Sequence, residues 1–285
     1  MSQPEVLAVL TGATGWLEAA LIVLVPLELL RWLRCRELDR GRLAEIGTNI
    51  ITLLPTVAMA GLTTATAIGV HRGLAGLLPW SVPTTPLTAA LALLVVDFLY
   101  YWEHRCAHRV PLLWAAYHVV HHSSPRFDQT TGLRISFVDG FVTPLFYLPA
   151  TALGLAPELV LGCFLCVIAY QTWIHTELIG RLPWLDGWLN TPANHRVHHA
   201  CQPHYHDRNF GAVLMLWDRL FGTYAPEQEA PRFGVSPPLG SSHPIAVHCY
   251  ALQQLWRRAM AQPGLRRRLA VLLSPPTPVP PATAN

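Results

Sequence analysis

Residues 84–122 have the sequence TTPLTAALALLVVDFLYYWEHRCAHRVPLLWAAYHVVHH, in which an apolar run of membrane-spanning length leads directly into two histidine clusters. The first cluster is HRCAH at 104–108 and the second is HVVHH at 118–122. A third cluster, HRVHH, follows at 195–199. Residues three and four apart share one face of a helix, so each cluster is expected to present its imidazoles together. The pattern predicts helices that carry metal-binding histidines at the end of a membrane segment.

The composition of the chain is typical of a membrane protein. Of its 285 residues, 52% are hydrophobic and 13% are charged, and the mean hydropathy is +0.31. Soluble domains average about 25% charged residues. All 20 basic residues are arginine, and the formal net charge is only +3. A surplus this small does not indicate a surface for nucleic acid.

Several apolar segments approach the length of about 20 residues that a membrane helix needs. The segments lie near residues 5–30, 46–70, 84–102, 137–155 and 157–175. The last two of these segments are separated by Gly154 and Pro157, and they are predicted to form a helical hairpin that enters the bilayer and returns.

These segments predict an all-α, multi-pass integral membrane bundle of about four to five membrane helices, with a histidine-rich helical cap in the cytosol. A single domain is expected over residues 1–274, with its histidine-box core at 97–227. The tail at 275–285 is rich in proline and is expected to be disordered.

Arginine positions predict the orientation, because short cytoplasmic loops are enriched in basic residues. The loop at 71–83 holds one arginine and is expected outside the cell, so the histidine clusters are expected on the cytosolic face of a bacterial inner membrane. The apolar stretch at 210–224 is expected to lie along the membrane surface as an amphipathic segment. The loops expected in the cytosol contain Arg31, Arg34, Arg36, Arg40, Arg42, Arg105, Arg109, Arg126, Arg134, Arg181, Arg196, Arg208 and Arg219.

The predicted hairpin allows the three clusters to meet, because two crossings return the chain to the same side. Another histidine, in the motif WIHTE, is expected where the last apolar segment emerges. Neutral imidazole is a common ligand of iron, zinc and copper, and eight or nine nitrogen ligands are too many for one ion. Two metal ions are therefore expected. A pair of irons in a cage of imidazoles at the bilayer surface would suit the activation of dioxygen, with zinc as a substitute in purified protein. The predicted ligands are His104, His108, His118, His121, His122, His175, His195, His198 and His199.

Other polar residues are expected around these histidines. Gln171 lies four residues before His175, and on a continuous helix its amide would face the metals as a weak ligand or hold a metal-bound water. Metal-bound histidines usually donate their second N–H to an acceptor, for which Asp97, Glu177 and Asp207 are the candidates. No separate protein base is assigned.

Some nearby residues receive a simpler interpretation. Thr191 followed by Pro192 predicts the start of the helix that carries the third cluster. Cys163 and Cys166 form a CxxC within an apolar run and are expected to pack in the core. An isolated histidine such as His71 is most simply a surface residue. His204 and His206 alternate in a way that does not match one helical face, and no role is assigned to them.

The region from Asp97 to Glu227 resembles the fatty acid hydroxylase/sterol desaturase superfamily of membrane di-iron oxygenases, which carry HxxxH, HxxHH and HxxHH boxes. Within it, the sequence is most similar to the alkylglycerol monooxygenase-like branch. The resemblance implies O₂-dependent hydroxylation or desaturation of a C–H bond in a fatty acid, sterol or ether lipid. The connecting segments that share this likeness are WAAYHVVHHSSPRFDQTTGLR at 114–134, QTWIHTELIG at 171–180, LNTPANHRVHHA at 189–200 and DRNFGAVLMLWDRLFGTY at 207–224.

The electron source is expected to lie outside the chain. The sequence contains no GxGxxG motif after a strand and no haem-domain sequence. A ferredoxin, a cytochrome or a reductase would serve as the external donor, and the resemblance implies a reduced pterin as another. The alternative function is a non-catalytic membrane metal-binding protein, either a transporter or a sensor. Such a protein would carry histidines along several helix interiors, so their placement on one side favours the oxygenase.

Overall fold

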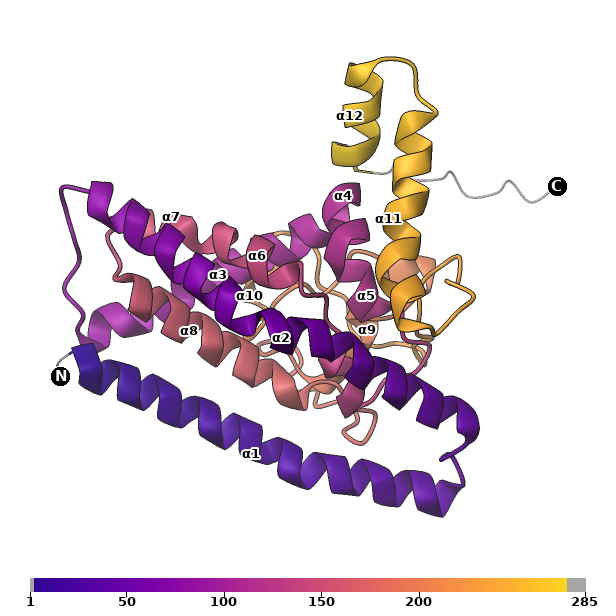
Figure 1. Ribbon diagram of the computed structural model, residues 1–285. Helices are drawn as coiled ribbons and strands as arrows, with labels where there is room; N and C mark the ends of the chain where they lie inside the picture. The colour runs from indigo at the N-terminus through magenta and orange to yellow at the C-terminus, as the bar shows by residue number, and fades with distance from the viewer. Residues whose placement is uncertain (1–2, 276–285) are drawn as a thin grey trace.

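The computed structural model describes residues 3–275, and within this range the regular structure is helical apart from two isolated β-bridges. The helices α1, α2, α3 and α8 run alongside one another; α4, α5 and α9 lie at one end of them and α7 lies toward the other (Figure 1). The all-α prediction is therefore confirmed. In chain order the elements are α1 (Gln3–Cys35), α2 (Arg40–Leu77), α3 (Pro86–Arg109), α4 (Pro111–Leu113), the π-helical turn η1 (Trp114–His118), α5 (Val119–His122), η2 (Gln129–Leu133), α6 (Asp139–Val142), η3 (Thr143–Tyr147), α7 (Leu148–Ala152), α8 (Pro157–Tyr170), η4 (Gln171–Trp173), α9 (Pro192–His198), η5 (Pro203–Tyr205), α10 (Leu216–Leu220), α11 (Pro244–Met260) and α12 (Leu265–Leu273).

Within the described residues, two helices, α2 and α3, are long and apolar enough to cross a membrane. α2 has 38 residues and extends over about 57 Å at 1.5 Å per residue. Its large apolar side chains are exposed, as at Leu54 (57%), Val57 (61%) and Leu62 (55%). Such a surface is unfavourable in water and matches the hydrocarbon of a bilayer. The predicted number of crossings stays a prediction.

The segment predicted as the first arm of the hairpin, 137–155, is not a single helix. It is divided into α6, η3 and α7. Pro144 and Pro149 lack the N–H that a continuous helix requires, which explains the interruption. His71 of α2, expected at the surface, is instead fully buried against this arm, with its ring 2.6 Å from Thr151 Oγ1 and 3.1 Å from the carbonyl oxygen of Pro144.

The chain nevertheless turns back at the predicted position, between the two segments. Gly154, with a φ of +89°, makes the turn between α7 and α8, a conformation that favours glycine. Its carbonyl accepts a hydrogen bond of 2.8 Å from the N–H of Val82, in the connection between α2 and α3. The two connections therefore lie together, at the end of α3 away from the histidines.

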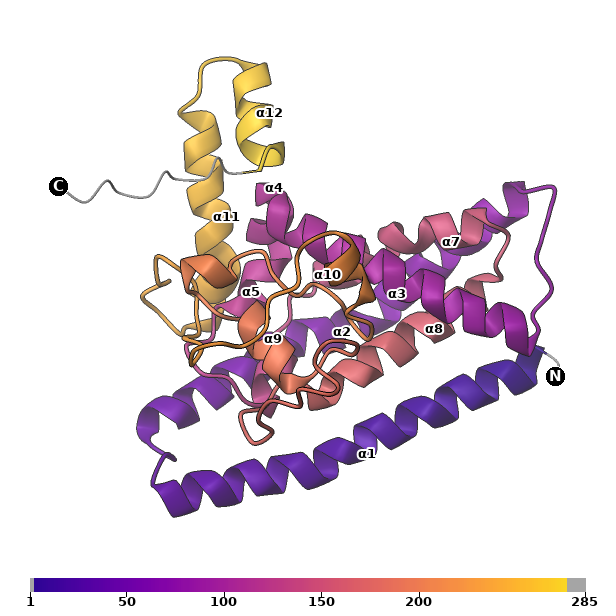
Figure 2. The ribbon, with the colours of Figure 1, turned by 180° about the vertical axis from the view of Figure 1, so that it is seen from behind.

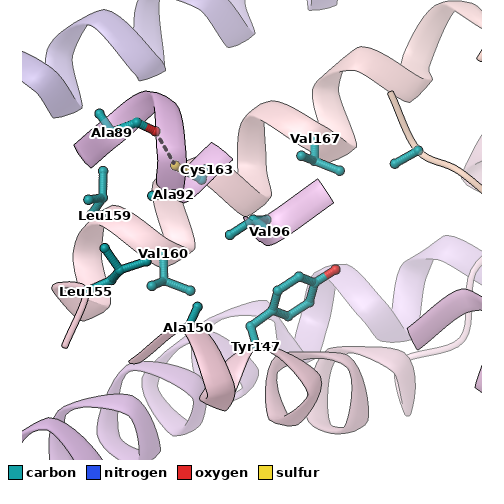
Figure 3. Close-up of a cluster of buried hydrophobic side chains, with 11 residues drawn as sticks. Ala89, Ala92, Val96, Tyr147, Ala150, Leu155, Leu159, Val160, Cys163 and Val167 are labelled. Carbon is teal, nitrogen blue, oxygen red and sulfur yellow. Dashed lines mark hydrogen bonds between the residues drawn. The ribbon is translucent and has the colours of Figure 1, made fainter. Parts of the chain in front are cut away.

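A small-residue core joins α3, α7 and α8 (Figure 3). Ala92 and Ala150 are fully buried, and their short side chains allow the helices to approach closely. Cys163 is also fully buried, with its sulfur 3.9 Å from the carbonyl oxygen of Ala89. The packing role predicted for Cys163 is confirmed.

The segment 210–224 is not an amphipathic surface helix, which corrects the prediction. Only Leu216–Leu220 is helical, and Phe210, Ala212 and Met215 are fully buried. α10, which forms part of this segment, lies beside α3 (Figure 2). A buried loop must satisfy its backbone N–H groups, and carboxylates of α3 and α10 accept from four of them.

The C-terminal helices α11 and α12 project away from the long helices (Figure 1). Of the predicted proline-rich tail at 275–285, residues 276–285 lie outside the described residues.

The membrane orientation can be tested with reporter proteins fused after residues 76, 126 and 230. α3 begins beside the connection at 78–85 and ends at the histidines. We therefore expect the reporter at 76 to be extracytoplasmic and the reporters at 126 and 230 to be cytosolic. Alkaline phosphatase and green fluorescent protein fusions would measure the two sides. Opposite sides for 126 and 230 would contradict the arrangement.

Candidate metal centre

Nine histidine side chains converge in two groups whose nitrogen ligand atoms lie within 4.8 Å of one another. All nine are residues that the sequence analysis proposed as ligands. Every described contact between the rings within these groups joins Nε2 atoms, at 2.8–3.2 Å. The five-histidine group is His104, His108, His118, His122 and His198, and the four-histidine group is His121, His175, His195 and His199.

These separations fit a metal ion. Ligands at about 2.0–2.1 Å from an ion are about 3.3 Å apart in a tetrahedron and about 3.0 Å apart at right angles. In the five-histidine group, Nε2 of His118 lies 3.1 Å from that of His104 and 3.0 Å from that of His108. In the four-histidine group, Nε2 of His195 lies 2.8 Å from that of His175. The closest pairs in each group therefore have the spacing of neighbouring ligands in a coordination shell.

The second and third boxes each contribute to both groups. His118 and His122 belong to the five-histidine group, whereas His121 belongs to the other. The third box divides the opposite way, because His195 and His199 join the four-histidine group and His198 the five-histidine group. Residues four apart differ by only about 40° around a helix, and residues three apart by about 60° in the other direction. The expectation that each box presents its three rings together is therefore too simple.

Local helix geometry positions the boxes. His104 and His108 end α3 on adjacent turns, and the π-helical turn η1 ends at His118. A π turn is rare and often occurs at functional sites, because its extra residue changes which side chains face the site. At the third box, Thr191 accepts from the N–H of Asn194 and Pro192 is the first helical residue, which confirms the predicted start of α9.

In three rings, the Nδ1 atom, which faces away from the group of Nε2 atoms, contacts a backbone carbonyl. Nδ1 of His104 donates to the carbonyl of Phe210 at 2.9 Å, and Nδ1 of His198 donates to that of Arg208 at 2.9 Å. Nδ1 of His175 donates to the carbonyl of Gln171 at 3.2 Å. With the proton on Nδ1, the lone pair on Nε2 is free to bind a metal.

The three carboxylates expected in this role behave differently. Asp97 accepts from the N–H groups of Val213 and Leu214 and from the indole of Trp217, so it holds the loop that supplies the Phe210 carbonyl rather than a histidine.

Asp207 lies 3.9 Å from Nδ1 of His108 and forms an ion pair of 2.7 Å with Arg109. Glu177 is exposed, and no hydrogen bond joins it to a box histidine among the described contacts.

Gln171 also differs from the expectation. α8 ends at Tyr170, so Gln171 and His175 are not on one continuous helix. The side-chain carbonyl of Gln171 accepts from the hydroxyl of Tyr100 at 2.8 Å, and its amide N–H donates to the carbonyl of Val167 at 3.2 Å. The amide is thus used within the fold, and it is the backbone carbonyl of Gln171 that orients His175.

Two other histidines lie outside both groups. The ring of His206 lies 2.9 Å from the carbonyl oxygen of Cys201. His204 is exposed and lies 3.4 Å from a carboxylate oxygen of Glu229. These contacts explain both residues as parts of the loop that follows α9.

The burial of the rings keeps them unprotonated. Desolvation lowers the pKa of His121 to about 4. It also lowers the pKa of the histidines of α9 and of His175 well below the ordinary value, and the neighbouring rings lower it further. Neutral rings are the form that binds metal.

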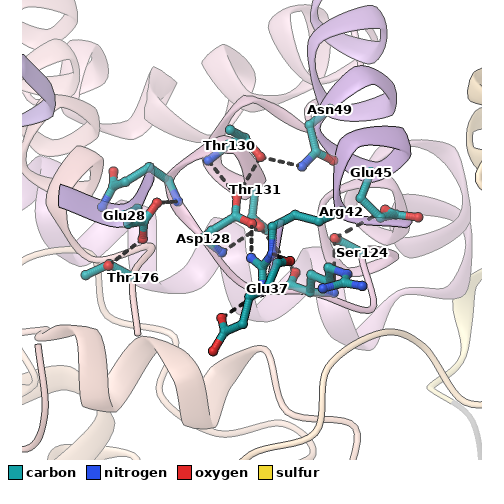
Figure 4. A network of polar contacts seen from close by, with 12 residues as sticks. Glu28, Glu37, Arg42, Glu45, Asn49, Ser124, Asp128, Thr130, Thr131 and Thr176 are labelled. Carbon is teal, nitrogen blue, oxygen red and sulfur yellow. Dashed lines mark hydrogen bonds and ion pairs between the residues drawn. The ribbon is translucent and has the colours of Figure 1, made fainter. Parts of the chain in front are cut away.

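A polar network that was not predicted from the sequence joins residues close in sequence to the second box and to His175 (Figure 4). Glu28 of α1 accepts from the hydroxyl of Thr176 at 2.6 Å and from the N–H of Gln129 at 3.0 Å. Arg42 forms an ion pair of 3.2 Å with Asp128. The network ties α1 and α2 to the segments that follow the second box and His175. The available signal was an acidic residue within an apolar segment, which is rarely without a role.

A cavity of ≈ 200 Å³ lies against the centre, and His118, His121 and His175 form part of its wall. It therefore adjoins both groups. Apolar residues line another part of it, namely Leu21, Leu133, Ile135, Phe164 and Ile168.

Metal analysis would test the two groups separately. We expect about two metal ions per purified chain, because the nine ligands exceed what one ion binds. The double variant His108→Ala/His118→Ala and the single variant His199→Ala each leave three ligands in one group, so each should lower the content toward one. Plasma mass spectrometry would measure this, with His204→Ala as the matched control. One ion in the wild-type protein would contradict the interpretation.

The metal-free protein should lose stability as the pH falls. The unfolded chain protonates His121 near pH 6.5, whereas the folded chain does so only near 4. Between these values the unfolded state binds more protons, so acid favours unfolding, by about 2 kcal/mol at pH 5 for this residue alone. Thermal unfolding at pH 7.5 and pH 5.0 would measure it. A His121→Asn protein should show a smaller decrease, and an unchanged wild-type midpoint would refute the expectation.

Comparison with known proteins finds a family match over the region that contains the histidines. Residues 89–223, which include all nine histidines, match the fatty acid hydroxylase family. The chain is 37% identical to alkylglycerol monooxygenase of Xenopus tropicalis and 35% identical to that of Homo sapiens, in each case over 82% of this chain and 52% of the relative. It is 34% identical to the ornithine lipid hydroxylase OlsE of Rhizobium tropici, over 47% of this chain and 40% of that protein.

The chain spans about half the length of the alkylglycerol monooxygenases it matches. No solved structure matches it. The family match and these similarities agree with the histidine boxes and their connecting segments. Residues 89–223 therefore match the fatty acid hydroxylase family, and over most of its length the chain is similar to alkylglycerol monooxygenases.

Proposed function

We propose that this chain is an integral membrane, non-haem di-iron enzyme that uses O₂ to hydroxylate a C–H bond of a lipid. The observation that carries the proposal is the convergence of nine Nε2 atoms in groups of five and four. The family match and the names of the relatives, which describe alkylglycerol monooxygenation and ornithine lipid hydroxylation, support it. The substrate is proposed to be a fatty acid, a sterol or an ether lipid.

The donor set suits iron. Neither group includes a thiolate or a carboxylate among the described residues, and imidazole binds iron, zinc and copper. Iron bound there would supply the activation of O₂. Zinc would occupy the same ligands in purified protein by the affinity order of divalent metals.

The protein contributes position and the exclusion of water. The rings are buried, as shown by the exposed fractions of 2% for His195 and 3% for His199. The cavity brings an apolar wall to His118, His121 and His175, so a hydrocarbon chain within it lies beside both groups. A metal transporter or sensor would not need this apolar cavity, and its presence favours the enzyme.

We place the centre at the cytosolic face of a bacterial inner membrane. The arginine-rich connection between α1 and α2 lies at the histidine end, because Asp39 pairs with Arg126 at 3.0 Å. Electrons would then come from a cytosolic ferredoxin, cytochrome or reductase, or from a reduced pterin.

Oxygen isotope incorporation would test the function. Iron-loaded protein in lipid nanodiscs is supplied with ¹⁸O₂, a chemical reductant and a bacterial lipid extract, and products are analysed by mass spectrometry. We expect one labelled oxygen atom in a lipid product. Ile135→Trp fills the cavity and should lower turnover at least about tenfold with both metals retained. Leu54→Trp, on the exposed face of α2, is the control.

Absence of a labelled product from every lipid class, with iron present and reduced, would contradict the proposal. An equal loss of turnover in the Ile135→Trp and Leu54→Trp proteins would contradict the assignment of the cavity.

A further inference from the structure

Two acidic side chains line the cavity without taking part in either histidine group. Glu103 of α3 is 5% exposed, and Asp139 begins α6. The hydroxyl of Thr143 contacts both carboxylates, at 3.2 Å from Glu103, and the hydroxyl of Tyr117 donates to Glu103 at 2.9 Å. The two acids therefore form one polar wall of the cavity.

Glu103 and Asp139 differ from the buried acids elsewhere in the described residues, because each of those has an arginine or a backbone N–H as a partner. Arg134 pairs with Glu45 at 2.7 Å, Arg42 pairs with Asp128, and backbone N–H groups hold the carboxylates of Asp97 and Asp218.

Among the ion pairs of the described residues, none includes Glu103 or Asp139; their protein partners are hydroxyl groups. A buried carboxylate without a positive partner is costly. A cation that enters the cavity would remove this cost.

An independent observation also points to a ligand. Gln129 lines the same cavity and is 5% exposed, yet neither the nitrogen nor the oxygen of its side-chain amide has a hydrogen-bond partner. Buried amides are nearly always hydrogen-bonded. A polar group in the cavity would satisfy this amide.

We propose that the cavity takes a lipid that carries a protonated amino group, held by Glu103 and Asp139, with a further polar group of the same lipid at Gln129. An ammonium group has three N–H donors and suits two carboxylates. Phe164 and Ile168 line the same cavity and would contact the hydrocarbon. This inference rests on the proposed lipid function and narrows its substrate to a lipid with an amino group, such as an ether lipid with an amino headgroup, which excludes free fatty acids and sterols.

Binding to zinc-loaded protein in nanodiscs would test the inference without oxygen chemistry. Dodecylamine and dodecanol are the probes, and their binding is measured against empty nanodiscs by equilibrium partition. We expect the amine to bind at least about tenfold more tightly than the alcohol. Glu103→Gln and Asp139→Asn should each weaken amine binding by about tenfold and leave the alcohol unchanged. Glu158→Gln, an exposed acid paired with Arg72, is the control.

Equal binding of amine and alcohol would overturn the inference, as would the same loss in the Glu158→Gln protein. If the Glu103→Gln protein does not retain zinc, amine binding to the Asp139→Asn and Gln129→Leu proteins tests the inference instead, and both should bind the amine more weakly. Neither residue is adjacent to a metal ligand in sequence. Labelled oxygen in a neutral lipid, with no preference for the amine, would refute this inference alone. Amine binding without oxidation of any lipid would instead refute the proposed function.

Discussion

Nine imidazole rings direct their Nε2 atoms toward one another at 2.8–3.2 Å. A neutral ring has one N–H and one lone pair, and where Nδ1 donates to a carbonyl, only the lone pair faces the group. The three rings fixed in this way present lone pairs to the groups, and a bound cation would satisfy these lone pairs together. Much of the surrounding structure serves this arrangement: the carbonyls of Arg208, Phe210 and Gln171 fix three rings, and burial keeps the rings neutral.

The two groups are also physically connected. The second and third boxes each send rings to both, so a shift of either short helix changes both sets of distances at once. The helices themselves are too short to be stable alone, since α5 has four residues and α9 has seven. Their positions depend on the loop held by Asp97 and on the polar network around Glu28. These two buried acids stabilise the centre through other residues, without touching a ring.

The features that the sequence could predict are those that depend on local periodicity. The helical boxes, the ninth histidine and the start of α9 at Pro192 follow from spacing and capping preferences. The division of each box between two groups, the broken segment before Gly154 and the role of Gln171 depend on tertiary contacts. Pro144 and Pro149 indicate where a helix would break, but the prediction of one segment over 137–155 followed the apolar composition instead. The acceptor at Phe210 is a backbone carbonyl, which every residue has, so the amino-acid sequence could not predict this contact.

The polar network has a consequence for how the protein is made. Glu45 of α2 accepts a hydrogen bond from Arg134 and another from Ser242, and the hydroxyl of Thr48 donates to the carbonyl of Ser242 at 2.8 Å. The environment of the centre therefore includes residues from α1 to the segment before α11, most of the length of the chain. A nascent chain still within the ribosome at residue 200 would lack this closing segment. We therefore expect the histidine groups to reach their finished geometry, and to bind metal in it, only after residue 242 has been synthesised.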